Sequence, residues 1–346
     1  MKFAKTIIAS LAIGLSGLAQ AAENLSAETA APGGSPHLSV SHLAEVAGEA
    51  GIANLQLQTG QTLTNTVMNI ANGTTDVGVA PLILPFLLKL GRGPYSKQGK
   101  EGAALADKLR ALYPYNFGAY SLFGFQSAGV TSYDQLKGKT IYNGPPRGGA
   151  LVGARQMLQL VGGIKEGDDY KGVQVNWGQA NKTIADGTAD MNLLPLTFPS
   201  DRVAAGQAAG AMTIVSVPKA TFDSESFQKW ARTPGNAPVE IRVYEMGYGP
   251  EVKIVSEDDM FRGVNITGAE IVSADMSDDL AKSLTAAYIA SMDALKAKTP
   301  WARNIGVGVL DAVQSGFCGP NPLKYHPGAI AAWEAAGYAV PDCAKP

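Results

Sequence analysis

The feature that most constrains the fold is an internal duplication. The sequence Ile-Ala-Asn-Gly-Thr-Thr-Asp-Val-Gly-Val-Ala-Pro-Leu at 70–82 returns at 184–196 as Ile-Ala-Asp-Gly-Thr-Ala-Asp-Met-Asn-Leu-Leu-Pro-Leu, with 7 of 13 positions identical. In both copies a helical pattern ends at a glycine suited to a helix C-cap, and a buried apolar strand follows and stops at a proline. Two copies are too few for a solenoid, so the duplication predicts two similar α/β lobes.

The segments before each copy complete a strand–helix–strand unit. In the first half, 55–59 alternates apolar and polar residues, Gly60 breaks the strand, and a helical stripe begins at Leu63. In the second half we expect a strand over 173–177 and a helix that closes at Ile184. Parallel strands joined by right-handed crossovers are the expected arrangement of such units. A further unit upstream has a strand at 139–143, a loop at 144–149 and a helix that ends at 162–163.

Ligands of open α/β sheets bind outside the carboxyl ends of the strands. Several of the loops at those ends open helices, whose free N–H groups and dipoles attract anions. The pattern therefore predicts a small anion bound in a cleft between two lobes. The candidate ligand-binding residues on these loops and their neighbours are Ser35, Thr59, Gly60, Gln61, Pro81, Arg147, Gly148, Gly149, Gln179, Thr197 and Phe198.

Arg147 and three aromatic residues have two interpretations each. The guanidinium of Arg147 forms a planar fork that matches a carboxylate, while the alternative is an exposed arginine on a mobile loop. Tyr142, Trp177 and Phe198 lie at predicted strand ends, where they would either wall a cleft or pack in the core of a lobe. The sequence leaves both alternatives open.

The first 21 residues have the pattern of an export signal. Lys2 and Lys5 precede an apolar run from 7 to 18, and Ala19-Gln-Ala21 forms a small-residue cleavage site, so we expect cleavage after Ala21. The apolar run is about 12 residues, too short for the ~20 that cross a bilayer. We therefore expect an exported, periplasmic chain without membrane insertion of the mature protein.

The two cysteines fit that compartment. Cys318 and Cys343 are 25 positions apart, and an oxidising environment allows them to pair, so we expect a disulfide that staples the C-terminal tail. A catalytic thiol is the alternative. On the chain-entropy account, such a loop contributes roughly 3–4 kcal/mol.

Composition and motifs exclude several classes of function. With 28 Lys+Arg against 30 Asp+Glu in 346 residues, the chain lacks the basic character of a nucleic-acid-binding protein. The three histidines, His37, His42 and His326, have no metal-ligand spacing, so we expect no metal site and no cofactor. Gly138-Lys-Thr140 lacks the first glycine of a phosphate-binding loop, and Ser226-Phe-Gln-Lys229 lacks its companion motifs. We expect a binding protein, not an enzyme.

An ordered set of short motifs resembles a known family. The set comprises Asp76-Val-Gly-Val, Lys108-Leu-Arg-Ala-Leu-Tyr113, Tyr133-Asp-Gln-Leu-Lys-Gly-Lys139, the Gly144-Pro loop, Ala185-Asp-Gly-Thr-Ala-Asp190 and His326-Pro-Gly-Ala329. Over residues 35–335 the chain resembles the TAXI solute-binding proteins of TRAP transporters. Two loops depart from the family pattern, Ala31-Pro-Gly-Gly-Ser-Pro-His37 and Gly144-Pro-Pro-Arg-Gly-Gly149.

The resemblance implies an α/β, two-lobed periplasmic-binding-protein clamshell of type II-like architecture. It also implies a monomer that delivers a small carboxylate, such as glutamate or 2-oxoglutarate, to a sodium-coupled TRAP permease. The expected division is a signal peptide at 1–21, a first lobe at 22–125 and 239–346, and a second lobe at 126–238. A binding protein of an ABC importer and an exported enzyme on the same fold are the alternatives.

Overall fold

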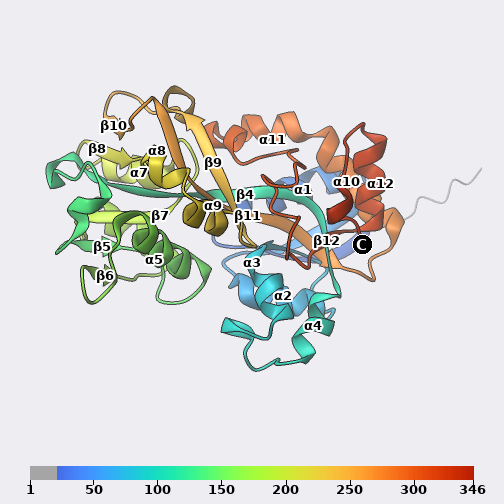
Figure 1. The fold of residues 1–346 in the computed structure, drawn as a ribbon. Coiled ribbons are helices and arrows are strands. Elements are labelled where there is room, and N and C mark those ends of the chain that lie inside the picture. The colour runs from blue at the N-terminus through green and yellow to red at the C-terminus, as the bar shows by residue number, and fades with distance from the viewer. Residues whose placement is uncertain (1–21) are drawn as a thin grey trace, which may run out of the picture.

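The computed structural model describes residues 22–346, and the expected signal peptide lies outside the described residues. The twelve strands of the described chain form one mixed sheet (Figure 1), whose central order is β2-β1-β3-β11-β4-β7-β5-β6. The strands are β1 (Glu23–Glu28), β2 (Ala53–Gln58), β3 (Val77–Pro81), β4 (Leu109–Phe125), β5 (Thr140–Tyr142), β6 (Lys171–Val173), β7 (Met191–Leu196), β8 (Met212–Val215), β9 (Asn236–Arg242), β10 (Val252–Val255), β11 (Met260–Ser273) and β12 (Lys324–Tyr325).

Helices cover both faces of this sheet. They are α1 (Ser35–Glu49), α2 (Leu63–Ala71), α3 (Ile83–Lys89), α4 (Glu101–Ala106), α5 (Gly149–Gly162), α6 (Ala180–Ala185), α7 (Asp201–Gln207), α8 (Lys219–Phe222), α9 (Glu225–Ala231), α10 (Asp278–Ala290), α11 (Met292–Lys298) and α12 (Pro327–Ala335). Short 3₁₀ helices include η1 (Gly93–Tyr95), η4 (Trp177–Gln179), η5 (Val243–Met246) and η6 (Pro300–Asn304).

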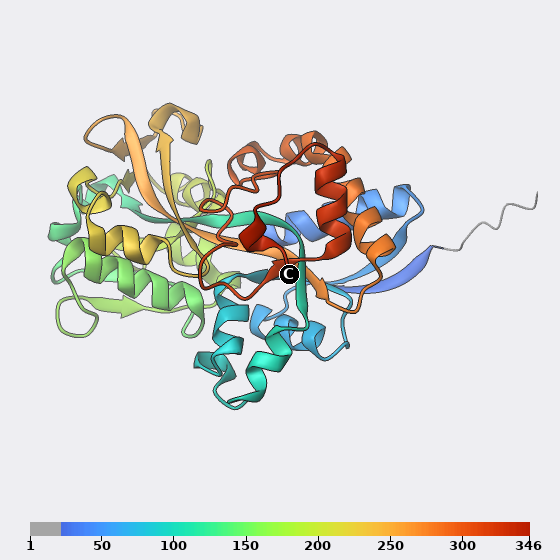
Figure 2. The same ribbon diagram turned by 45° about the vertical axis from the view of Figure 1, so that its right-hand side comes forward.

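The buried apolar residues separate into two lobes. One large cluster joins β1–β3, the start of β4, the end of β11 and the C-terminal helices, and we call this part the first lobe. Two smaller clusters lie around β5, β7, β8 and the remaining halves of β4 and β11, and they form the second lobe. In Figures 1 and 2 the blue, cyan and red elements therefore stand apart from the green and yellow ones. The two-lobed α/β architecture expected from the duplication is confirmed.

Two long antiparallel strands connect the lobes. β4 and β11 pair from Tyr120 with Val264 to Leu109 with Ser273, and their register shifts between Ile266 and Thr267. On β4, Gly118 has a φ of +124°, and a Cβ there would lie 2.8 Å from the carbonyl carbon and oxygen of Leu196. Glycine is therefore required at the point where β4 passes between the lobes.

The two copies of the duplicated unit have the same local structure. In the first, the Asp76 carboxylate accepts hydrogen bonds from the backbone N–H and the hydroxyl of Ser26, at 2.8 and 2.7 Å. In the second, Asp190 accepts the equivalent pair from Thr140, both at 2.7 Å. Each aspartate thus joins its turn to a strand residue 50 positions earlier in the chain. The repeated aspartate has a structural role in each lobe.

One predicted strand is misplaced. We expected a strand over 173–177, but β6 ends at Val173 and Trp177 begins the 3₁₀ helix η4. The chain leaves the sheet because polar partners outside it bind the next residues. The Gln174 side chain donates to Asn143 at 2.7 Å, and the N–H of Val175 donates to the carbonyl of Gly144 at 3.3 Å.

The chain returns to the first lobe along β11. Val239, Val252 and Phe261 pack in the second-lobe cluster, although we expected residues from 239 onward to join the first lobe. The reason is strand pairing, since β9 pairs with the second-lobe half of β11 and β10 pairs with β8. The division at 125 and 238 remains a prediction.

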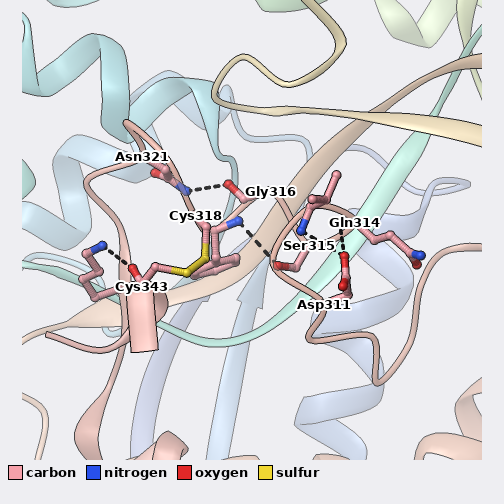
Figure 3. The surroundings of a disulfide bond; sticks show 10 residues. Asp311, Gln314, Ser315, Gly316, Cys318, Asn321 and Cys343 are labelled. Atoms are coloured by element: carbon pink, nitrogen blue, oxygen red, sulfur yellow. Dashed lines mark hydrogen bonds between the residues drawn. A yellow bond between two sulfur atoms is a disulfide. The ribbon is translucent and has the colours of Figure 1, made fainter. Parts of the chain in front are cut away.

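The disulfide between Cys318 and Cys343 is confirmed (Figure 3), with Cα atoms 5.4 Å apart. The side chain of Asn321 donates to the carbonyl of Gly316 at 3.1 Å, which joins the segment between the bonded cysteines to the chain just before Cys318. A Cβ on Gly316 would lie 2.4 Å from the hydroxyl of Thr267. The stapled tail therefore reaches the strand that connects the lobes.

Candidate functional site

Two glycine loops open long helices at the ends of parallel strands, one in each lobe. β1 leads through Gly33 and Gly34 into α1, and β5 leads through the 144–148 loop into α5. Gly33 and Gly148 have φ values of +94° and +110°, and a Cβ at either position would meet nothing within 4 Å. Neither helix has a side-chain N-cap hydrogen bond. Within residues 22–346, no side chain therefore caps the start of either helix, although Pro36 in the first turn of α1 has no N–H to donate. Free N–H groups at a helix start favour anions.

Buried hydroxyls surround the loop of the first lobe. Thr29 follows β1 and is 0% exposed, and Ser35 begins α1 and is 1% exposed. Thr267, on β11 where the lobes join, is also 0% exposed. Within residues 22–346 none of these three hydroxyl oxygens has a hydrogen-bond partner. Buried hydroxyls normally have partners, so these three are unsatisfied donors, and that of Thr267 lies against Gly316 of the tail.

The structure brings the predicted residues of the first lobe together. The N–H groups of Gly60 and Gln61 donate to the carbonyls of Ala30 and Thr29, at 3.2 and 2.9 Å. These bonds hold the loop after β2, with exposed Thr59, against the loop after β1. Pro81 ends β3 and pairs with Gly268 on β11.

The predicted loop of the second lobe contacts the first lobe. Arg147, Gly148 and Gly149 are exposed, and a Cβ on Gly149 would lie 3.5 Å from the side chain of Ile83 in α3. Gly235, before β9, approaches the same residue, and a Cβ there would lie 2.6 Å from the backbone nitrogen of Ile83. The side chain of Arg147 makes no hydrogen bond or ion pair within the described part of the chain.

The remaining candidates divide between surface and core. Gln179 is exposed at the end of η4, and Thr197 is half-buried after β7. Phe198 is 4% exposed, and its ring packs edge-on against Phe261 with centroids 5.0 Å apart. The side chain of Phe198 therefore belongs to the core of the second lobe. Tyr142 is also a core residue, with 0% of its surface exposed.

Arg202 is the residue that sequence reasoning missed. It lies in the first turn of α7, and its guanidinium stacks over the ring of Trp177 at 4.8 Å. It donates one hydrogen bond, to the carbonyl of Pro195 at 2.8 Å, and is half-buried. Burial lowers the pKa of Arg202, although an arginine remains charged in proteins. No carboxylate of residues 22–346 forms an ion pair with it.

The position of Arg202 gives a cation to the carboxyl ends of the second-lobe strands. β7 ends at Leu196, η4 carries Trp177, and both supply contacts to the guanidinium. A cation in the first turn of a helix opposes the helix dipole, and a half-buried cation without a partner is unfavourable. An anionic ligand would supply the missing charge. In the sequence, Arg202 stands two residues after Ser200, which caps α7, and this position alone does not mark it as a ligand contact.

At the base of the second-lobe loop, hydrogen bonds join residues whose charges neutralise each other. Asn143 follows β5, is 0% exposed and donates to Glu166 at 2.7 Å. Arg155 of α5 binds the same carboxylate with two hydrogen bonds, at 2.8 and 2.9 Å. Hydrogen bonds from Arg155, then from Asn143, lower the pKa of Glu166 to about 2 despite partial burial. Because Arg155 is already paired, the cations left for a ligand among the residues discussed on this side are the half-buried Arg202 and the exposed Arg147.

A buried acid lies beneath α1 in the first lobe. Glu270 is 0% exposed and accepts hydrogen bonds from Tyr113 and Tyr115, at 3.2 and 3.4 Å. Burial raises the pKa of Glu270 to about 8, and the neighbouring hydroxyls only partly oppose this shift. The carboxyl is therefore neutral at pH 7 and adds no negative charge near the binding loops.

Two further findings concern metals and membranes. Across residues 22–346, no group of three or more His, Cys, Asp or Glu side chains is arranged to hold a metal ion. In the same range, no helix is long and apolar enough to cross a membrane.

The chain belongs to the NMT1-like family, whose model matches residues 28–337. Among curated proteins, no relative matches the chain.

Several solved structures resemble the chain weakly. A TRAP periplasmic solute-binding protein from Ralstonia eutropha H16 with bound (S)-2-acetolactate is 14% identical, with 93% of this chain and 87% of that chain covered and a TM-score of 0.45. A putative sulfonate-binding ABC transporter protein from Methylobacillus flagellatus is 14% identical, with 92% and 88% covered and a TM-score of 0.45. The ectoine-binding protein of a Halomonas elongata TRAP transporter is 11% identical, with 90% of each chain covered and a TM-score of 0.45. Family membership rests on the family model alone.

Proposed function

We propose that this protein is a periplasmic solute-binding protein that captures a small organic anion between its two lobes and delivers it to a membrane permease. The observation that carries the proposal is Arg202, a half-buried cation without a carboxylate partner at the strand ends of the second lobe. We propose that the uncapped start of α1 and the unpartnered hydroxyls of Thr29 and Ser35 add neutral donors at the strand ends of the first lobe.

Together these groups suit a carboxylate better than a neutral solute. The guanidinium of Arg202 offers a planar fork, and its stacking on Trp177 fixes the plane of that fork. Helix N–H groups only donate hydrogen bonds, so they favour an acceptor-rich ligand, and hydroxyls can donate to the same ligand. Arg147 stands on the exposed loop of the same lobe, and we propose that it closes over the anion as a second, weaker contact. The remaining candidate residues on the loops are proposed to line the cleft.

We further propose that the permease is of the TRAP type and that the protein is a TAXI-like receptor. The ordered motif set over 35–335 supports this assignment, and the disulfide fits an oxidising periplasm. This assignment is tested by measuring ligand uptake into vesicles that contain the permease encoded beside this gene. The proposal expects uptake that requires this protein and a sodium gradient. Uptake that requires ATP instead would assign the protein to an ABC importer.

Calorimetry with a panel of small carboxylates tests the binding site. Arg202→Ala should weaken the bound carboxylate by about 1.5–3 kcal/mol, the range for hydrogen bonds to charged groups, and Arg202→Lys should restore part of the affinity. Arg147→Ala should have a smaller effect in the same direction. Arg232→Ala, which removes an exposed arginine of the same lobe, is the control and should bind normally.

Two results would contradict the proposal. The first is a folded Arg202→Ala variant that binds as tightly as the unmodified protein. The second is recovery of the carboxylate in a chemically altered form, since a receptor returns its ligand unchanged.

A further inference from the structure

A second cationic pocket lies in the first lobe. Its volume is about 480 Å³, and this open surface pocket is bordered by the end of α3, the start of β4 and the tail segment between the disulfide-bonded cysteines. The charged side chains that line it are Lys89, Asp107, Arg110 and Lys324. Pro346, the last residue of the chain, also lines the pocket. Three cations against the Asp107 carboxylate and the terminal carboxylate leave the lining with an excess of one positive charge.

The cations are held close together by strand pairing. β12 runs parallel to β4, and Lys324 is the register partner of Arg110. Like charges placed opposite each other on neighbouring strands destabilise a sheet. Lys89 adds a third positive charge from the end of α3, and it lowers the pKa of Lys324 after the larger effect of burial.

Protein groups do not neutralise this cluster. Arg110 donates to the carbonyls of Asp107 and Leu109, both at 2.8 Å. Lys324 donates to the carbonyl of Cys343 at 2.5 Å. Lys89, Arg110 and Lys324 form no ion pair with any carboxylate of residues 22–346. Their partners are neutral carbonyls, so the positive charge remains available.

The wall opposite α3 is preorganised. The disulfide closes the segment that carries Pro320 and Pro322, and the side chain of Asn321 binds the backbone on both sides of itself, at Gly316 and Leu323, each at 3.1 Å. Two prolines and a cross-link reduce the freedom of this wall, which lowers the entropy lost when a ligand binds. A local conflict of charge in an otherwise well-ordered structure is typical of a functional site.

We propose that this pocket binds a small organic polyanion that carries two or more carboxylate or phosphate groups. Its volume lies in the range of small-molecule sites and exceeds what one inorganic ion fills. The pocket is separate from the proposed carboxylate site because Arg110 and Lys324 meet at the first-lobe end of β4, whereas Arg202 follows β7 in the second lobe. The site is therefore independent of the proposed function.

Binding of citrate to the full chain at low ionic strength, followed by NMR chemical shifts, tests the pocket. Inorganic phosphate and acetate are parallel probes that distinguish phosphate chemistry and single charges from a polycarboxylate. Lys89→Ser should weaken citrate binding about three- to tenfold, because a charged contact is lost at a partly exposed site. Lys324→Ser should have the larger effect, since this lysine is less exposed. Lys89 is exposed and makes no hydrogen bond, so the fold should tolerate its replacement.

Two controls keep the test specific. Lys97→Ser removes an exposed lysine of the same lobe, between η1 and α4, that does not line the pocket, and it should leave citrate binding unchanged. Arg232→Ala, which removes an exposed arginine of the second lobe, should also leave it unchanged. Equal citrate affinity in Lys89→Ser and the unmodified protein would overturn the proposal. Equal losses in Lys97→Ser, or acetate binding as strong as citrate binding, would do the same by showing a non-specific charge effect.

Discussion

The buried carboxyl of Glu270 should make the first lobe less stable as pH rises. Its folded-state pKa is about 8, against 4.5 for a free glutamate, so between these values the folded protein retains a proton that the unfolded chain releases. The stabilisation that comes from burying the neutral acid is complete below pH 4.5 and is lost as pH rises through 8. Glu270→Gln keeps the shape and removes the titration. Its amide oxygen can accept from one tyrosine hydroxyl, and its amide nitrogen can donate to the other.

The magnitude follows from linkage. Each pH unit inside this window changes the free energy of unfolding by up to about 1.4 kcal/mol, so from pH 5.5 to 7.5 the unmodified protein should lose at most about 2.7 kcal/mol through this group. Both proteins are unfolded with denaturant at several pH values, and the difference between their free energies of unfolding isolates Glu270. We expect the free energy of unfolding of Glu270→Gln, relative to that of the unmodified protein, to increase steadily as pH rises.

A matched control isolates the effect of burial. Glu49→Gln changes an exposed glutamate of the same lobe, at the end of α1, and should reproduce the pH dependence of the unmodified protein. The reasoning fails if Glu270→Gln also reproduces that dependence. It fails as well if the unmodified protein becomes relatively more stable with rising pH, because this would mean that Glu270 is ionised and stabilised in the folded state.

Two other predictions concern covalent and backbone constraints. Replacing Cys318 and Cys343 with serine should lower the free energy of unfolding by roughly 3–4 kcal/mol and weaken citrate binding at the cationic pocket of the first lobe. The affinity of the proposed carboxylate site, measured by calorimetry, should stay nearly unchanged. A large loss of that affinity would place the tail in the carboxylate site. Gly118→Ala should destabilise the fold by at least about 2 kcal/mol in thermal melts, because the new Cβ would meet the backbone of Leu196 at a positive φ. Gly48→Ala, in an open position of α1, should be neutral or stabilising, and equal behaviour of the two variants would refute the argument.

Local patterns in the sequence were enough to predict the repeated units. The Gly-Thr-x-Asp turns recur because in each lobe the aspartate accepts hydrogen bonds from a neighbouring strand. Asp76 and Asp190 could therefore be recognised as equivalent from the sequence alone. The pairing of Cys318 with Cys343 followed from the number of cysteines and the compartment. These signals are local or compositional, and they do not depend on how distant segments pack.

The rest depended on distant contacts. Phe198 stands at a strand end but packs on Phe261, and only the pairing of β9 with β11 brings that residue into the second lobe. Arg202 became a candidate ligand contact because it stacks on Trp177 and has no carboxylate partner in residues 22–346. Neither observation can be made from the sequence. Arg110 and Lys324 likewise become neighbours only through the register of β12.

The central claim, that an anion is held between two lobes connected by β4 and β11, is tested most directly by small-angle X-ray scattering with a carboxylate that calorimetry shows to bind. A ligand that contacts both lobes favours the closed arrangement by its differential affinity for that state. We predict a smaller radius of gyration with the ligand for the unmodified protein, and no change for Arg202→Ala at the same ligand concentration. Coincident scattering curves for the unmodified protein, with and without a bound ligand, would contradict the account.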